Sequence, residues 1–268
     1  MRHIVRFSTA FISAAAVLAL GELPGPASAA GDQDGWVQLF NGKDLTGWDT
    51  WLNKLPGENE PIGLNKDPLG VYKVEDGAIH ISGQVFGALT SQREYENYHL
   101  RVEFKWGEKK WPPRENAVRD SGVLYHCVGP HGAAGGNWMR SQECQVQEHD
   151  CGDYYSVAGG IVDVEAERVG EKKNQLKHTK GGELVVGHKA RIIKSEDHEK
   201  PTGEWNVIEV IADGGTCTHV VNGVVVMVMT NSRQVVEGKE VPLTQGKIQL
   251  QSEGAEVWYR KVEIKPLK

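Results

Sequence analysis

The sequence lacks most features that mark membrane-spanning, nucleic-acid-binding or disulfide-rich proteins. The apolar run from Phe11 to Leu20 is too short to cross a bilayer. The formal net charge is −6, with no basic footprint of the kind that binds nucleic acid. Only four cysteines occur in 268 residues, and none forms a CxxC pair, which leaves a structural zinc site poorly supported. No window predicts an amphipathic helix of three turns, and we find no internal repeat.

The N-terminal segment has the layout of an export signal. Arg2 and Arg6 precede the apolar run, and Ala27-Ser28-Ala29 then supplies a small-x-small cleavage site. No cysteine follows the run, so a lipid anchor is not expected. We therefore predict a signal peptide over 1–29, cleavage near Ala29, and release to the periplasm or the extracellular space.

Export bears on the four cysteines, because disulfides form and persist in oxidising compartments. Four cysteines allow three connectivities, and the sequence does not select one. The sequence therefore allows one or two disulfides within this set: Cys127, Cys144, Cys151 and Cys217.

Residue alternation predicts an all-β chain. HLRVEFKW (99–106) places apolar residues at every second position, with charged residues between them. Two-residue turns separate apolar runs at Asp76-Gly77 and Asn222-Gly223, which is a strong short-range signal for a β-hairpin. The segments 247–251 and 257–264 alternate in the same way.

Composition and turn spacing indicate a β-sandwich. The chain holds 32 glycines, and turn signals recur about every ten residues. Long irregular connections occur at 51–70, 107–120 and 128–141, and loops of that length in a compact domain tend to be functional or mobile. With no interdomain linker in sight, we expect a single domain over 30–268.

The stretch SQECQVQEHD (141–150) carries the strongest hint of a site. Glu143, Gln145 and Gln147 alternate with apolar or small residues, so a carboxylate and two amides would share one face of a strand. Carboxylates and amides together suit a surface that holds molecules rich in hydroxyl groups.

An antiparallel neighbour would enlarge this face. GVLYHCV (122–128) precedes the stretch across a glycine-rich loop, so the two strands are expected to pair. We expect the core to receive Cys127, Cys144 and Val146. The opposite face would then carry three polar side chains, His126, Glu143 and Gln145. Trp138 and Tyr154 lie near in sequence and would add flat apolar surfaces for sugar rings.

Each of these residues also has an ordinary structural explanation. A single buried histidine such as His126 is more often a hydrogen-bonded structural residue than a catalyst. A single acid such as Glu143 on a strand is usually a solvated charge, and tryptophans are by default part of the core.

A second chemistry is compatible with the same stretch. Glu143 and Glu148 have the spacing E-x-x-x-x-E, similar to the E-x-D-x-x-E strand of laminarinase-type retaining glycosidases. Positions 143 and 148 differ by five, an odd number, so in a regular strand the two side chains point to opposite faces. They would meet on one face only if a β-bulge intervened. Gln145 stands where those enzymes have an aspartate, which weighs against double-displacement hydrolysis.

Eight segments together resemble a family of secreted domains described as 3-keto-disaccharide hydrolases, or 3-keto-glucoside-1,2-lyases and 3-keto-2-hydroxyglucal hydratases. They are QLFNGKDLTGW (38–48), VEFKWGEKKW (102–111), RDSGVLYHC (119–127), WMRSQECQVQE (138–148), GDYY (152–155), GEWN (203–206), VNG (221–223) and LQSEGAEVWYRKVEI (250–264). The similarity covers nearly all of the chain after residue 30. Gln147 and His149-Asp150-Cys151 are less typical of the family.

The resemblance implies a concanavalin A-like jelly-roll sandwich that holds a sugar already oxidised at C3. It also implies a functional link to a separate sugar 3-dehydrogenase. The reaction is elimination and hydration, which needs a base near C2, an acid near the leaving oxygen and a donor or cation on the ketone.

For this reaction we predict Glu143 or His126 as the base, with the other residue, or Glu148 if a bulge turns it inward, as the acid. Gln145 would hold sugar hydroxyls, and Arg119 and Asp120 would bind substrate or tighten the loop. A divalent cation held by acids and His126 could also polarise the ketone, but the sequence does not establish one. The alternatives are a non-catalytic carbohydrate-binding module and the retaining glycosidase.

Overall fold

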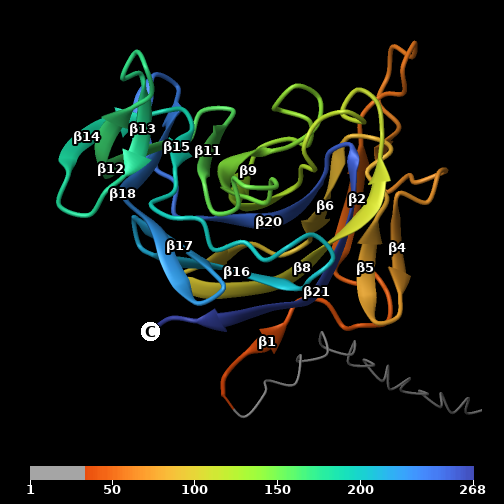
Figure 1. The fold of residues 1–268 in the computed structure, drawn as a ribbon. Helices are drawn as coiled ribbons and strands as arrows, with labels where there is room; N and C mark the ends of the chain where they lie inside the picture. Colours follow the sequence, from red (N-terminus) through yellow and green to blue (C-terminus); the bar gives the residue numbers. More distant parts are fainter. Residues whose placement is uncertain (1–33) are drawn as a thin grey trace, which may run out of the picture.

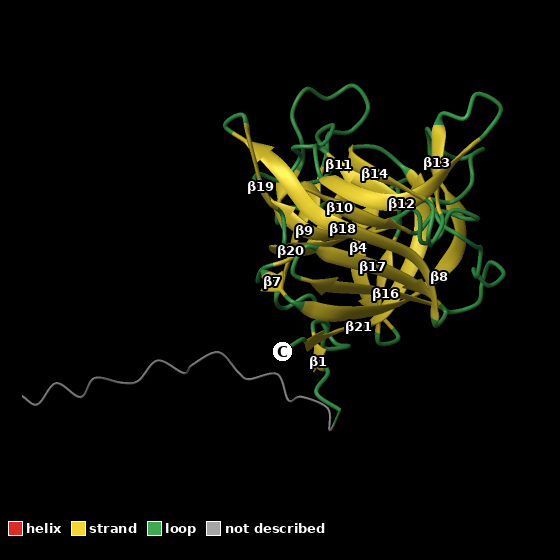
Figure 2. Ribbon diagram, turned by 90° about the vertical axis from the view of Figure 1, so that its left-hand side faces the viewer, coloured by secondary structure: helices red, strands yellow, loops and turns green. Residues whose placement is uncertain are grey.

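The computed structural model describes residues 34–268, and every regular element in this range is a β-strand. Figure 2 shows strands joined by loops and turns. No segment in the described range is a helix that could cross a membrane. The predicted signal peptide over 1–29 lies outside the described residues.

One layer, the front sheet, is antiparallel throughout. Its strands, in order across the sheet, are β3 (Gly63–Leu64), β2 (Trp48–Leu52), β6 (Gly87–Ser91), β20 (Gln245–Ser252), β9 (Gly122–Val128), β10 (Arg140–Gln145) and β11 (Tyr154–Val157). The short β7 (Tyr95–Glu96) pairs with the start of β20. The long connection 129–139 leaves the sheet between β9 and β10.

The second layer, the back sheet, is larger. Its strands, in order, are β4 (Tyr72–Glu75), β5 (Ala78–Ile81), β21 (Ala255–Pro266), β8 (Tyr98–Lys110), β16 (Asn206–Asp213), β17 (Thr216–Val221), β18 (Val224–Val236) and β12 (Ile161–Val169). Five short strands flank it: β1 (Val37–Gln38) on β21, β19 (Lys239–Pro242) on β18, and β13 (Gln175–His178), β14 (Glu183–His188) and β15 (Ile192–Ile193) next to β12 and β11.

The core fills the space between the two layers (Figure 1). Leu100, Val102 and Phe104 of β8 are fully buried, and the alternation predicted for 99–106 is confirmed. From the front sheet, Val123 and Leu250 point into the same core. The fold is therefore the all-β, concanavalin A-like jelly-roll sandwich that the sequence predicted.

Both predicted hairpins are confirmed. Asp76-Gly77 joins β4 to β5, and Asn222-Gly223 joins β17 to β18. All four turn residues have positive φ, between 50° and 84°. A two-residue turn with positive φ at both positions matches the twist of the flanking strands, and Asn, Asp and Gly tolerate it best.

Strand alternation gives the front sheet a second face, which points away from the back sheet and which we call the outer face. On β20, Leu250 points into the core, so Gln249 and Gln251 point outward. Their partners in register extend this polar surface over β6, β9 and β10.

A core truncation tests this packing. Replacing Leu250 with alanine should lower the free energy of unfolding by about 2–5 kcal/mol, because a buried leucine loses its contacts and leaves a cavity. Val186→Ala on β14 is the matched control, since Val186 is 64% exposed and should change stability by less than about 0.5 kcal/mol. Equal losses for the two variants in urea unfolding would contradict the assigned orientation of β20.

Candidate functional site

Three carboxylates gather at one end of the outer face, and we call them the acid cluster. Asp120 lies just before β9, Glu143 lies on β10, and Glu253 lies in the turn between β20 and β21. Asp120 is 3% exposed and Glu143 is 4% exposed, while the Glu253 side chain is 14% exposed. Acids are seldom this buried unless they are paired or functional.

A glycine makes room for the central acid. Gly122 on β9 is the register partner of Gln145, so its missing side chain would point to the outer face. A β-carbon at this position would lie 2.0 Å from Oε1 of Glu143 and 2.7 Å from Oε1 of Gln251. The Glu143 carboxyl group therefore occupies space that any larger residue at position 122 would fill.

One guanidinium connects two of the acids. Arg114 Nη2 lies 2.5 Å from Oδ2 of Asp120, and Nη1 lies 3.9 Å from Oε1 of Glu253. The Gln147 amide also donates to Oδ2 of Asp120. The cluster thus contains three carboxyl groups and one positively charged side chain, that of Arg114.

Two oxygen atoms of the cluster are left open. Within residues 34–268, Oδ1 of Asp120 and Oε1 of Glu143 are buried and have no hydrogen-bond partner. A buried acceptor without a partner is costly and uncommon. Both atoms thus call for an explanation, and a catalytic role is one.

Burial sets the protonation of the cluster. It raises the pKa of Asp120 to about 6, although Arg114 and Gln147 favour the charged form. It raises the pKa of Glu253 to about 8, and the Asp120 charge adds to this rise. Burial, together with the charges of Glu253 and Asp120, raises the pKa of Glu143 well above its usual range. Near pH 7 the cluster therefore offers both a proton acceptor and proton donors.

Three of the predicted site residues lie in or beside this cluster. Asp120 and Glu143 belong to it, and Gln145 shares the outer face with Glu143 two residues along β10. The Gln145 side chain accepts a hydrogen bond from the backbone N–H of Val146 at 2.9 Å.

His126 does not share this face, so the predicted arrangement is wrong for this residue. Its φ is 53°, and the register between β9 and β10 shifts at this point. This bulge turns the ring toward Tyr98 of the back sheet, with ring centroids 5.9 Å apart. The ring is fully buried, and burial lowers the pKa of His126 to about 4.

The same bulge moves Cys127 to the outer face, where it packs with Leu124 and Met139 rather than in the main core. Cys144 and Val146 lie in the main core as predicted. All four cysteines are buried free thiols, so none of the disulfides that the sequence allows is formed.

Glu148 lies beyond the end of β10 and makes an ion pair with Arg119. Its two oxygens accept from the Arg119 backbone N–H at 2.8 Å and from Arg119 Nη1 at 2.9 Å, and Thr202 donates at 2.8 Å. These partners lower the pKa of Glu148 despite its burial. The pairing of Glu148 with Glu143, which depended on a bulge, therefore finds no support in the contacts of Glu148.

The prediction for Tyr154 was wrong by one position. Tyr154 is fully buried and belongs to the main core. Its neighbour Tyr155 is the register partner of Glu143 and therefore faces outward. Trp138 covers part of the outer face, where its indole N–H donates to the Gly87 carbonyl at 3.1 Å.

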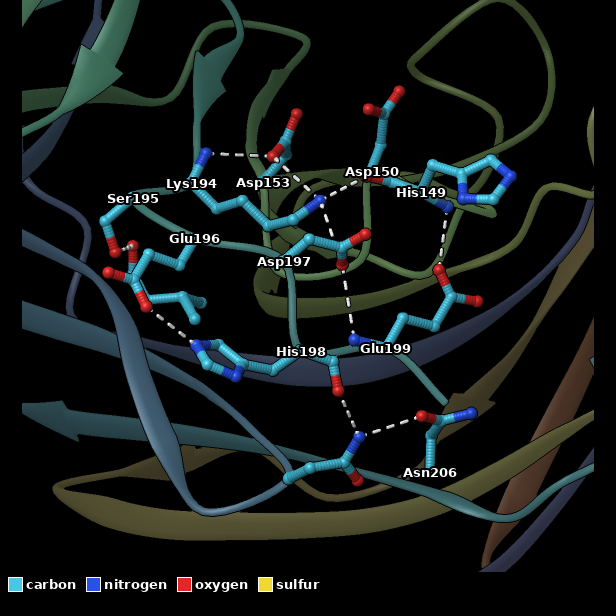
Figure 3. Close-up of polar contacts among 12 residues, drawn as sticks. His149, Asp150, Asp153, Lys194, Ser195, Glu196, Asp197, His198, Glu199 and Asn206 are labelled. Atoms are coloured by element: carbon cyan, nitrogen blue, oxygen red, sulfur yellow. Dashed lines mark hydrogen bonds and ion pairs between the residues drawn. The ribbon is translucent and has the colours of Figure 1, made fainter. Parts of the chain in front are cut away.

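A buried lysine fixes the loop that follows β10 (Figure 3). The ammonium group of Lys194 donates to the carbonyl of His149 and lies 3.6 Å from Asp197 and 4.0 Å from Asp153. Glu199 accepts from the backbone N–H of His149 at 2.7 Å. These contacts hold the segment 194–199 against the loop that carries Gln147.

Sequence reasoning missed Arg114, Gln251 and Glu253. Gln249 and Gln251 alternate on β20 just before Glu253, the same pattern of amides and acid that drew attention to β10. That pattern was the signal in the sequence that could have identified Gln251 and Glu253. Among the described residues, no group of three or more His, Cys, Asp or Glu side chains has an arrangement suited to a metal ion.

Comparison with known proteins identifies the family. Residues 35–265 match the model of the 3-keto-alpha-glucoside-1,2-lyase-like domain, and the chain belongs to this family. The family and the fold give the protein a carbohydrate-active role. No curated protein matches the chain.

Two solved structures share the fold, each of a "putative glycosyl hydrolase" from Parabacteroides distasonis. The first is 22% identical with a TM-score of 0.51, and the match covers 88% of this chain and 95% of that one. The second is 20% identical with a TM-score of 0.50, and the match covers 87% of this chain and 99% of that one.

The raised pKa values of the acid cluster predict how the free energy of unfolding depends on pH. Because the folded state raises these pKa values, it binds more protons than the unfolded state, and the cluster's stabilisation is lost as pH rises from about 4 to about 8. Glu253→Gln should therefore gain stability relative to the wild type as pH increases, by about 1 kcal/mol or more between pH 5 and 8. Urea unfolding at several pH values measures this difference, with Glu58→Gln as the exposed control. Parallel curves for wild type and Glu253→Gln would refute the raised pKa.

Proposed function

We propose that the protein cleaves glycosides oxidised at C3, by elimination followed by hydration of the product. Family membership supports this substrate class. The observation that carries the proposal is the acid cluster, which combines an ionisable carboxylate and neutral carboxyl groups around one arginine.

The ketone at C3 makes the proton on C2 acidic, so a carboxylate is a sufficient base. We assign this role to Asp120, whose pKa of about 6 leaves it ionised at neutral pH and whose buried Oδ1 has no hydrogen-bond partner within residues 34–268. Arg114 and Gln147 hold its other oxygen and favour the charged form. Loss of the C2 proton gives an enolate, which reforms the ketone as the C1–O bond breaks and leaves a double bond between C1 and C2.

The other two acids are suited to donate a hydrogen bond or a proton. Glu143 is held neutral by burial, and a neutral carboxyl group can donate a hydrogen bond to an enolate oxygen. Glu253, with a pKa of about 8, keeps its proton at pH 7 and would give it to the departing oxygen. Water then adds across the new double bond, with its proton returned through the same groups.

The export, the upstream enzyme and the cation that the sequence suggested remain part of this proposal. The protein would act after export, downstream of an enzyme that oxidises the sugar at C3. A divalent cation on the ketone remains a prediction that chelation tests. The retaining-glycosidase alternative finds no support in the position of Glu148, whose oxygens are taken by Arg119 and Thr202.

A matched pair of substrates tests the function. Purified protein should release nitrophenol from the 3-keto derivative of p-nitrophenyl glucoside and not from p-nitrophenyl glucoside itself. Loss of activity after EDTA would add a cation to the mechanism. Release from the unoxidised glucoside would instead identify a glycosidase, and sugar binding without release would identify a binding module.

Asp120→Asn should lower kcat by about 10²–10⁴-fold, whereas Asp49→Asn, on the same face but outside the cluster, should not.

Gly122 gives an independent test of the Glu143 position. Gly122→Ala places a methyl group where Oε1 of Glu143 lies, so the carboxyl group must move while the strand can stay in place. We expect kcat on the keto substrate to fall at least about tenfold, since a displacement of about 1 Å can cost a hundredfold. The thermal midpoint and circular dichroism of the variant report whether the fold is kept. Unchanged kcat in a folded variant would exclude Glu143 from the reaction.

A further inference from the structure

Two strands of the back sheet separate next to β12 and leave a pocket of about 550 Å³ between them, which we call the fork pocket. Strand β18 pairs with β12 as far as Val164, and β13 pairs with β12 from Ala166 onward. Both use the same edge of β12, because β14 occupies the other edge. Figure 1 shows these four strands together at one side of the molecule.

The far side of the fork pocket is closed by the chain after β15. Where β18 no longer pairs with β12, its Val226 carbonyl accepts a hydrogen bond from the Ser195 N–H at 2.9 Å and another from the Ser195 hydroxyl at 3.1 Å. The volume lies within the range of about 300–1,000 Å³ that is usual for small-molecule sites. No residue of the acid cluster lines the pocket.

Most of the wall is apolar. Val164 is buried and belongs to the main core, and Val228 is half-buried. Leu184 and Val225 are 58% and 52% exposed, although both line the pocket. A ligand with an apolar body would remove this surface from water, which is the main favourable contribution to binding in such pockets.

One buried polar atom in the lining has no partner. His178 is 7% exposed, and its Nδ1 donates to the Glu165 carbonyl at 3.1 Å. Burial lowers the pKa of His178, so the ring is neutral near pH 7. With the proton on Nδ1, Nε2 is a hydrogen-bond acceptor. Within residues 34–268 no group donates to this atom, so a ligand that carries a donor would satisfy it.

The charges around the fork pocket cancel. Asp163 makes an ion pair with Arg233 at 2.9 Å. Glu165 accepts from the Gly181 N–H at 2.7 Å, and Lys180 brings the opposite charge to the same lining. An ionic ligand would meet no excess of opposite charge here, so the lining favours an uncharged one.

We propose that the fork pocket binds an uncharged, largely apolar molecule with a hydroxyl group, of the class of aromatic alcohols. The hydroxyl donates to Nε2 of His178, and the ring lies against Val164, Leu184 and Val228. A sugar is a poor match, because its many hydroxyl groups would face a mostly apolar wall. The site is separate from the acid cluster, and the proposal does not depend on the reaction proposed above.

Two probes that differ only in the hydroxyl group test the proposal. Isothermal titration calorimetry at pH 7 should show binding of 2-naphthol, and 2-methoxynaphthalene should bind about tenfold more weakly because it has no donor for Nε2. His178→Phe keeps an aromatic ring but removes the acceptor. This variant should weaken 2-naphthol about tenfold and leave the affinity for 2-methoxynaphthalene nearly unchanged.

A second pair of variants tests the apolar wall without touching His178. Leu184→Ala should weaken 2-naphthol at least about threefold, since it removes apolar surface from the wall. Val186→Ala is the matched control, because Val186 is 64% exposed on the same strand but does not line the pocket. Circular dichroism and the thermal midpoint show whether each variant is folded.

Three results would overturn the proposal. They are absent binding of 2-naphthol, equal affinity of wild type for the two probes, and equal effects of Leu184→Ala and Val186→Ala. Sedimentation velocity decides whether a second copy of the chain fills the pocket instead. A dimer that Leu184→Ala dissociates and Val186→Ala does not would make the pocket a contact between copies, and this too would overturn the small-molecule site.

Discussion

Burial of three carboxylates around one guanidinium is the interaction on which the site depends. Arg114 can balance at most one negative charge fully, so Asp120, Glu143 and Glu253 cannot all ionise at neutral pH without a large cost. Protons must therefore remain in the cluster. The sandwich provides the rigid surroundings that make this arrangement possible, because strand alternation places Glu143 on the outer face and Gly122 leaves space for its carboxyl group.

The two borders of the cluster are built differently. On one border, Lys194 and Glu199 hold the loop that brings Gln147 to Asp120. On the other, the hydroxyl of Ser252, next to Glu253, donates to the Val85 carbonyl, and the Asn53 N–H donates to the Phe86 carbonyl. Charged groups thus support the border beside Asp120, and neutral groups support the border beside Glu253.

Local signals in the sequence were enough for much of the fold. The alternation over 99–106 and the turns at Asp76-Gly77 and Asn222-Gly223 depend on a few neighbouring residues, and the structure confirms all three. The site was harder to predict. A single bulge at His126 reverses the faces expected for His126 and Cys127. Tyr154 was predicted for the outer face, whereas Tyr155 lies there, because the local pattern does not fix where β10 ends and β11 begins. In a strand, a shift of one residue moves each side chain to the opposite face.

The sequence alone determined the all-β class, the sandwich, the family and the strand face that carries Glu143 and Gln145, since each depends on periodicity or on motifs within short segments. Only the tertiary structure decided which acids meet. Glu253 and Arg114 come from loops far from Glu143 along the chain, and they reach it because β20 pairs with β9 and β9 pairs with β10. Their raised pKa values arise from burial, which is a property of the packed sheet and its covering loops and not of any short segment.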